Sequence, residues 1–143
     1  MGSLMAWRAK VIESVFGTVP GEELLTENRR YYARHVADGS HVAVVAAVDG
    51  EDAGCGAVCL YDELPSPENP NGRCGYIMNV YVRPQWRKRG IGTAITQRLV
   101  AIARNSGCGK VYLEATALGA PLYRDCGFRP MDGMMQLANQ IKP

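Results

Sequence analysis

The sequence predicts an α/β (α+β) fold in which a mixed sheet carries helices on both sides. Three features favour this fold: two helical patterns at the start, short β-branched runs from residue 41 onward, and a return of the helical period after residue 89. The chain has 143 residues, of which 47% are apolar and 21% charged, as in ordinary globular proteins. We therefore expect a single domain over residues 1–143.

Two amphipathic helices are predicted before the first strand. Over residues 4–16 four apolar side chains fall on one stripe at helical spacing: Leu4, Trp7, Val11 and Val15. The sequence GTVPG interrupts this pattern, and a second helical pattern covers residues 22–37 and ends before Gly39.

Three strands and a loop follow these helices. The run HVAVVAAV over residues 41–48 is β-branched and apolar on both faces, as in a buried central strand. The turn sequence DGED leads into residues 54–61, so we expect these two strands to form a hairpin. A proline-rich loop over residues 62–73 is long enough to have a function of its own, and residues 74–82 form the third predicted strand.

The rest of the chain returns to the helical period before a shorter strand. Residues 90–105 form a predicted helix with an apolar face made of Ile91, Ile95, Leu99 and Ile102. We then expect a strand over residues 110–115, a brief helix over 119–126, and a last strand or hairpin over 128–137.

Composition narrows the classes of function. No run approaches the 18 apolar residues of a membrane span and the start lacks the apolar core of a signal peptide, so a cytoplasmic location is expected. A net charge of +2 is too mild for a general nucleic-acid binder. Two histidines, and five cysteines without a CxxC pair, predict neither a metal centre nor a disulfide framework.

The strongest local signal is a basic turn between a strand and a helix. The segment RPQWRKRGIG, residues 83–92, holds four cationic side chains and two glycines. A helix N-terminus offers free N–H groups and a partial positive charge, and glycines let an anion approach the backbone. The Gly-Lys-Ser/Thr ending of a P-loop is absent, and Ile95 replaces the last glycine of the dinucleotide pattern. The turn therefore predicts a pyrophosphate site of another kind.

Residues 87–92 read Arg-x-x-Gly-x-Gly, which resembles the pyrophosphate loop of the GNAT superfamily, the Gcn5-related acyltransferases that use acetyl-CoA. The strand NVYV, the following helix and the segment PLYRDCGF (121–128) stand in the family's order. The resemblance runs from about residue 22 to 137 and is closest to the bacterial small-molecule branch. It implies a GNAT-like, mostly antiparallel sheet whose usual first strand is missing, leaving an edge that is short or covered by a partner.

The resemblance also implies how acetyl-CoA, the co-substrate, is held. The third strand offers its backbone to the pantetheine arm, and Thr116 replaces an asparagine that the family often has seven residues before its catalytic tyrosine. The implied cofactor-binding residues are Val80, Tyr81, Val82, Arg87, Lys88, Arg89, Gly90, Ile91, Gly92, Thr93 and Thr116. No metal is implied.

Tyr123 matches the family tyrosine that protonates the leaving CoA thiolate, a step for which a phenol with a pKa near 10 is suited. The general base is less determined. Tyr76 occupies the position of the glutamate of histone-type members, whereas Glu114 ends the neighbouring strand, and residues 62–63 could attract an ammonium group or act through water. The expected catalytic residues are Tyr123 and Glu114, and the expected substrate-binding residues are Asp62, Glu63, Tyr76 and Asn79.

The predicted activity is transfer of the acetyl group of acetyl-CoA to a primary amine of a small molecule, by direct attack in a ternary complex. A protein or peptide N-acetyltransferase is an alternative, as is an acetyl-CoA-binding module without turnover, because the strand glutamate is absent. A nucleic-acid-binding domain that uses residues 83–89 ranks last. We expect no nucleic-acid or membrane partner, and a homodimer stays open.

Overall fold

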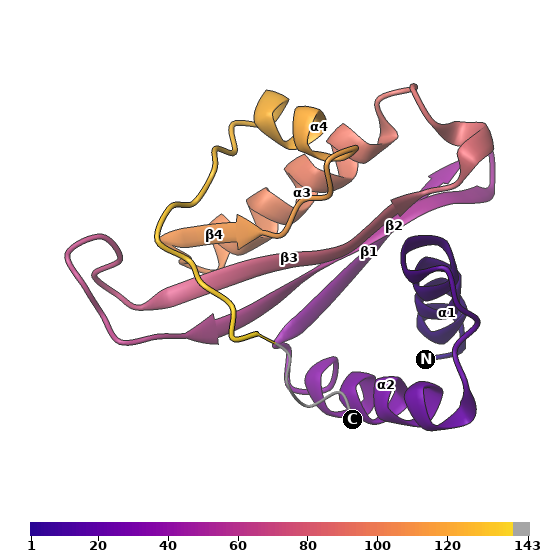
Figure 1. The fold of residues 1–143 in the computed structure, drawn as a ribbon, viewed down its shortest axis with the longest axis horizontal. Helices are drawn as coiled ribbons and strands as arrows, with labels where there is room; N and C mark the ends of the chain where they lie inside the picture. Colours follow the sequence, from indigo (N-terminus) through magenta and orange to yellow (C-terminus); the bar gives the residue numbers. More distant parts are fainter. Residues whose placement is uncertain (139–143) are drawn as a thin grey trace.

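The computed structural model describes residues 1–138, which contain four α-helices, one 3₁₀ helix and four strands (Figure 1). In chain order they are α1 (Gly2–Phe16), α2 (Glu22–His35), β1 (His41–Val48), β2 (Glu51–Asp62), β3 (Arg73–Val82), η1 (Pro84–Trp86), α3 (Ile91–Asn105), β4 (Lys110–Leu113) and α4 (Ala120–Asp125). This succession confirms the predicted order of elements as far as α4. The first described element is a helix, and no described helix is long and apolar enough to cross a membrane.

The four strands form one sheet in the order β1-β2-β3-β4. β2 pairs antiparallel with both β1 and β3, whereas β3 and β4 run parallel. The predicted hairpin of β1 and β2 is confirmed, and its turn holds Asp49 and Gly50 at φ values of 51° and 81°. The predicted mixed, mostly antiparallel sheet is confirmed as well. Because parallel neighbours need a long connection, α3 crosses between β3 and β4.

β1 is an edge strand, so the prediction of a buried central strand over residues 41–48 is wrong. Alternate residues of β1 pack toward α3, but Val45 on the opposite face is 40% exposed. That second face is buried at His41, whose ring packs on Tyr31 and Tyr32 of α2. A short run that is apolar on both faces can therefore belong to an edge strand. In β1 one face packs toward α3, and α2 covers one end of the other face.

Helices cover both faces of the sheet, as predicted. α3 and α4 lie together on one face, and α1 and α2 lie on the other (Figure 1). α3 approaches β2 closely because Gly54 and Gly56 carry no side chain. A Cβ on Gly56 would lie 2.7 Å from Cγ2 of Ile95 and 2.9 Å from Cδ1 of Leu99. The core beneath α3 is tightly closed, since Val58 and Leu99 are both 0% exposed.

On the opposite face α1 packs through Trp7, which meets the ring of Tyr81 edge-on at 6.4 Å between centroids. Val11 belongs to the same buried cluster, whereas Val15 in the last turn is exposed and Ile12 is buried instead. The predicted apolar stripe of the first helix is thus confirmed in its middle and wrong at its end.

The predicted strand or hairpin over residues 128–137 is wrong. After α4 the described chain contains turns and irregular backbone without ladder partners. Pro130 cannot donate a ladder hydrogen bond, Gly133 adopts a φ of 86°, and Met135 is 96% exposed. The predicted strand over 110–115 is confirmed only as far as Leu113. Turn residues and a missing partner strand therefore outweigh the apolar pattern of this segment.

Candidate active site

β3 and β4 separate part-way along β3. Their ladder runs from the pair Cys74–Lys110 to the pair Ile77–Leu113 and stops there, because β4 ends while β3 continues to Val82. Within residues 1–138, the segment 78–82 therefore has β2 on one side and no strand on the other. We call this opening the β3–β4 gap. Such a gap leaves main-chain donors and acceptors free for an extended ligand.

Alternation along β3 decides which backbone groups face the gap. The amide of Arg83 donates to the carbonyl of Ala53 in β2 at 2.9 Å. The N–H and C=O groups of Val82 and Val80 therefore point away from β2. The carbonyl of Val82 already accepts a hydrogen bond from Nε of Arg87 at 2.9 Å. Both valines thus stand where pantetheine contacts were predicted, and that role stays a prediction.

Two other predicted residues of β3 face elsewhere. Tyr81 is buried against α1, and by alternation its backbone groups face β2. Asn79 lies at an irregularity in the pairing with β2 and has a φ of 61°, which is rare for a residue with a side chain. Its Oδ1 accepts from Nη1 of Arg8 at 2.9 Å, so α1 braces the backbone at this point.

The predicted anion site is a left-handed turn at the start of α3. Lys88 and Gly90 have φ values of 63° and 80°, and Gly90 caps the helix. Within the described chain no acceptor binds the amides of residues 88–93, whereas the amide of Ala94 donates to the carbonyl of Gly90 at 3.0 Å. A Cβ at Gly90 would meet nothing within 4 Å, so the turn opens to solvent. Free amides and the helix dipole together favour an anion here.

The cations of this turn lie against aromatic rings. The guanidinium carbon of Arg89 lies 5.1 Å from the ring centroid of Trp86, and that of Arg87 lies 5.4 Å from the ring of Tyr81. Both arginines and Lys88 are exposed. The site therefore combines backbone donors with full positive charges, which suits a pyrophosphate.

The first turn of α3 also holds α4 in place. Ile91 packs against the core beneath α3, and Thr93 is half-buried. Gly92 is buried, and a Cβ there would lie 2.8 Å from Cδ1 of Leu122 in α4. The missing side chain at Gly92 thus lets α4, with Tyr123, approach the basic turn.

Tyr123 is half-buried in α4 and its ring meets that of Phe128 edge-on at 6.1 Å between centroids. Burial raises the pKa of the Tyr123 hydroxyl, so the phenol is neutral at pH 7 and can donate a proton. Thr116 orients the start of this helix, since its Oγ1 accepts from the amide of Gly119 at 3.2 Å. Its predicted contact with CoA stays a prediction.

Glu114 and Tyr76 meet beside the last rung of the β3–β4 ladder. The hydroxyl of Tyr76 donates to Oε1 of Glu114 at 2.7 Å. Burial, together with this hydrogen bond, raises the pKa of Tyr76 to about 12, so the hydroxyl stays a donor. Glu114 is exposed, and its second oxygen has no partner within the described residues. This carboxylate can accept a proton from a neighbouring amine or water.

The loop after β2 is fastened to the sheet. Glu63 accepts from Nδ2 of Asn69 at 3.2 Å and from Nζ of Lys110 at 3.1 Å, and these hydrogen bonds lower its pKa. Asp62 ends β2 and is exposed. The structure therefore places both predicted substrate-binding carboxylates at the start of β3, apart from Glu114 at the end of the ladder. Their role toward a substrate stays a prediction.

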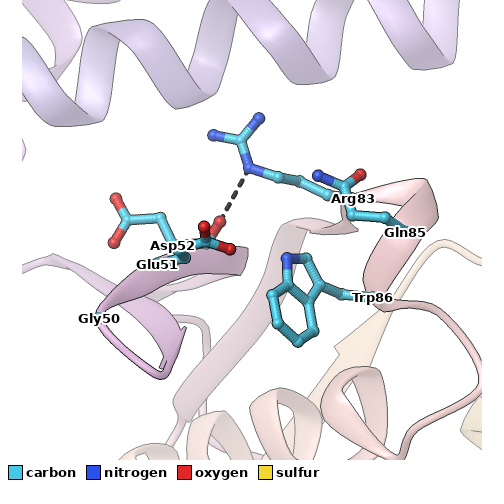
Figure 2. A pocket seen from close by; sticks show the side chains of 6 residues that line it. All are labelled: Gly50, Glu51, Asp52, Arg83, Gln85 and Trp86. Carbon is cyan, nitrogen blue, oxygen red and sulfur yellow. Dashed lines mark hydrogen bonds between the residues drawn. The ribbon is translucent and has the colours of Figure 1, made fainter.

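An open pocket of about 460 Å³ lies where the β1–β2 turn faces the residues after β3 (Figure 2). Figure 2 shows Arg83 reaching toward the turn, where its Nε donates to the carbonyl of Asp52 at 2.8 Å. Trp86 lines the pocket and connects it to the basic turn, but Tyr123 and Glu114 do not line it. The pocket is therefore separate from the predicted acid and base. Among residues 1–138 no cluster of His, Cys, Asp and Glu could hold a metal ion.

Residues 7–128 match the model of the acetyltransferase (GNAT) family. The chain belongs to this family. The match includes the four strands, the basic turn and α4, so it covers every element of the candidate site.

Known GNAT proteins resemble the chain in structure and in sequence. A predicted acetyltransferase from Clostridium acetobutylicum, solved with acetyl-CoA, is 30% identical with a TM-score of 0.86, over 96% of this chain and 88% of that one. A glucosamine 6-phosphate N-acetyltransferase of Trypanosoma brucei brucei is 38% identical over 63 residues, which are 44% of this chain and 43% of the relative. An aminoglycoside N(6')-acetyltransferase type 1 of Stenotrophomonas maltophilia is 27% identical over 111 residues, 75% of this chain and 71% of the relative. The chain spans about half the length, or less, of the glucosamine 6-phosphate relatives it matches.

Two tyrosines of this GNAT chain were missed by the sequence analysis. Tyr112 of β4 lies opposite Tyr76, with ring centroids 5.0 Å apart, and its hydroxyl forms a hydrogen bond with that of Tyr61 in β2. The alternation of side chains along each strand could have shown that these tyrosines point away from the apolar face of their strands. Only the register between the strands brings the three rings together.

Proposed function

We propose that this GNAT chain, acting as a single domain, transfers the acetyl group of acetyl-CoA to a primary amine of a small molecule in a ternary complex. The observation that carries the proposal is the β3–β4 gap, which begins beside Glu114 and Tyr76 and leads toward the basic turn at residues 87–92. The related structure solved with acetyl-CoA supports the co-substrate. The curated relatives named for glucosamine 6-phosphate and for aminoglycosides support a small amine as acceptor.

In this proposal the basic turn binds the pyrophosphate of acetyl-CoA. The free amides of residues 88–93 donate to it, and the neighbouring cations neutralise its charge. The pantetheine arm then lies along Val80 and Val82 in place of a fifth strand, as in β-augmentation. Arg87 has to release the carbonyl of Val82 if the arm is to bind that acceptor. The thioester stops at the pair Ile77–Leu113, because from this pair back to Cys74–Lys110 strands β3 and β4 are hydrogen-bonded to each other and leave no gap.

The proposed chemistry needs one proton acceptor and one proton donor. The amine nitrogen attacks the thioester carbonyl carbon, the carbon–sulfur bond breaks, the amine loses a proton and the CoA thiolate gains one. An alkylamine with a pKa of about 10.4 is unprotonated in only about 1 molecule in 2,500 at pH 7, a handicap of about 4.6 kcal/mol. Glu114 therefore takes the amine proton, directly or through water. Tyr123 protonates the thiolate, and a backbone N–H of β3 polarises the carbonyl.

The test is transfer by the purified chain. Acetyl-CoA is incubated with a panel of small primary amines and a peptide with a free lysine, while CoA release and the mass of each acceptor are measured. Acetylation of a small amine with matching CoA release supports the proposal. Binding of acetyl-CoA without any product contradicts it in favour of a binding module, and acetylation of the peptide alone favours a peptide transferase. Glu114→Gln should lower kcat, whereas Glu51→Gln, which replaces an exposed carboxylate at the start of β2, should leave kcat unchanged.

A further inference from the structure

Three tyrosines from three strands form one aromatic surface next to Glu114. We call Tyr61, Tyr76 and Tyr112 the tyrosine platform. The ring of Tyr112 is inclined by 35° to that of Tyr76 and by 76° to that of Tyr61, whose centroid is 6.4 Å away. The hydroxyl hydrogen bond between Tyr61 and Tyr112 joins β2 to β4 across β3. The platform is therefore held on rigid strands and not on a loop.

The platform lies on the sheet face opposite α3. Ile77 packs into the core beneath α3, so the side chain of its neighbour Tyr76 points to the other face. Tyr61 is 37% exposed and Glu114 is exposed, so a ligand can reach both. Tyr76 is one residue before the last rung, where the proposed thioester stops. An acceptor on the platform would thus be next to the reacting carbonyl.

Within residues 1–138, the charged groups beside the platform are a lysine that is paired with a carboxylate and a second carboxylate that is not paired with a cation. Nζ of Lys110 lies 5.2 Å from the ring centroid of Tyr112, but it is also 3.1 Å from Oε1 of Glu63, which neutralises it. Glu114 accepts a hydrogen bond from the neutral Tyr76, and no cation contacts its carboxylate in the described part of the chain. Among the described residues, the one cation placed against these rings is thus paired with a carboxylate, so the platform attracts a cation and is a poor site for a phosphate.

We propose that the tyrosine platform selects the acceptor, a cationic amine carried on a ring that bears no anionic group. The inference rests on the proposed function and deepens it. The C–H face of such a ring packs on the phenol rings. The ammonium group pairs with Glu114 before it loses its proton. A free amino sugar fits this description, whereas the same sugar with a phosphate brings a second anion beside Glu114.

The test uses glucosamine as the ring amine, ethanolamine as an acyclic control, and two variants of Tyr61. Tyr61→Leu removes the aromatic ring, and Tyr61→Phe keeps the ring but loses the hydroxyl. We expect Tyr61→Leu to raise KM for glucosamine by about three- to tenfold, with KM for ethanolamine and for acetyl-CoA unchanged. Tyr61→Phe should raise KM for glucosamine by less than Tyr61→Leu does. Glucosamine 6-phosphate should have a KM at least about tenfold above that of glucosamine.

Ligand-observed NMR on the CoA-bound chain measures glucosamine binding without turnover and separates this inference from the proposed function. If no amine is acetylated but Tyr61→Leu weakens glucosamine binding, the proposed acetyl transfer is contradicted, whereas the proposed role of the platform in binding the acceptor is supported. If transfer occurs and Tyr61→Leu affects both amines equally, or Tyr61→Phe acts like Tyr61→Leu, the platform is wrong. Absence of glucosamine binding to the parent chain, or a glucosamine 6-phosphate KM equal to or below that of glucosamine, also overturns it.

Discussion

Single residues determine the protonation states on which the proposed chemistry depends. Tyr76 occupies the strand position at which a glutamate would be the obvious base, but with a pKa of about 12 it stays a neutral donor. The carboxylate that it touches, Glu114, is the group that can accept a proton. Burial keeps Tyr123 neutral in the opposite role. The proposed acid thus comes from α4, and the proposed base is the residue that follows β4.

Tyr123→Phe tests the acid. The phenylalanine ring keeps the packing on Phe128, so the melting temperature and the acetyl-CoA affinity should be preserved. Only proton donation to the thiolate is lost, and kcat should fall by about 10²- to 10⁴-fold. CoA release and thermal unfolding are measured on the same preparation. A kcat within about twofold of the parent would show that Tyr123 is not the acid.

His41 makes stability depend on pH. Burial lowers its pKa to about 4, whereas an unfolded histidine has a pKa of about 6.5. The unfolded chain therefore binds a proton more readily, so the stabilisation is complete above about pH 6.5 and is lost as pH falls toward 4. The loss reaches at most about 3 kcal/mol. Glu63 and Asp38, whose pKa values are lowered from ordinary carboxyl values, contribute at more acidic pH.

Urea unfolding between about pH 7 and about pH 5 measures this dependence. His41→Gln removes the titrating group and should flatten the change in the free energy of unfolding. If the variant retained the parent's pH dependence over this range, another group would be responsible.

At the scale of elements, prediction from sequence succeeded where the signal is local. The glycines and apolar spacing of α3 lie in one contiguous segment, so the helix predicted over 90–105 is found at Ile91–Asn105. The position of β1 at the sheet edge and the irregular segment 128–138 depend on whether a partner strand is available. Local pattern carries no information about that partner.

The same limit applies to the candidate site. The basic turn is contiguous in sequence, and its residues could be proposed together. Tyr61 and Tyr112 lie 51 residues apart and meet only through the register of three strands. Glu63 illustrates the converse, because its acidic character was visible in the sequence but its ion pair with Lys110 was not.

Gly90→Val tests the basic turn as an element. At a φ of 80° a β-branched residue is strained, and its side chain would project into the open space at the turn where the pyrophosphate is proposed to bind. Acetyl-CoA affinity should fall at least about tenfold, roughly 1.4 kcal/mol, by calorimetry. Gly17→Val is the matched control, because Gly17 has a φ of 73° and similarly open space at the end of α1.

Both variants should lose comparable stability, about 1–2 kcal/mol, from the left-handed conformation. Only the change at Gly90 should affect acetyl-CoA. Equal affinities of the two variants for acetyl-CoA would show that the turn does not bind the co-substrate.

At the scale of the whole molecule, the sheet separates the proposed binding of acetyl-CoA from the proposed binding of the acceptor. The face under α3 and α4 carries the basic turn and Tyr123, and the opposite face carries the tyrosine platform. In the proposed function, a ligand in the β3–β4 gap contacts Tyr123 from one face and the acceptor on the platform from the other. This arrangement requires α3 to lie close to the sheet, and the two glycines of β2 allow that approach.

Gly56→Ala tests this close packing. The added methyl group would lie 2.7 Å from Cγ2 of Ile95 and 2.9 Å from Cδ1 of Leu99, so α3 or the sheet has to shift. The free energy of unfolding should fall by about 1–3 kcal/mol in urea. Gly2→Ala, at the start of α1, meets nothing within 4 Å and should change stability by less than about 0.5 kcal/mol. Similar stabilities of the two variants would contradict the packing argument.

The one-sided pairing of β3 beyond Ile77 has a consequence for hydrogen exchange with solvent. The amide of Arg83 is bonded to β2, whereas those of Val80 and Val82 point into the β3–β4 gap. In the free chain, deuterium should therefore enter alternate amides of this segment quickly and the amides between them slowly. A ligand that adds a strand in the gap should protect Val80 and Val82 while leaving Arg83 unchanged. The alternation of fast and slow amides would then disappear on saturation with acetyl-CoA.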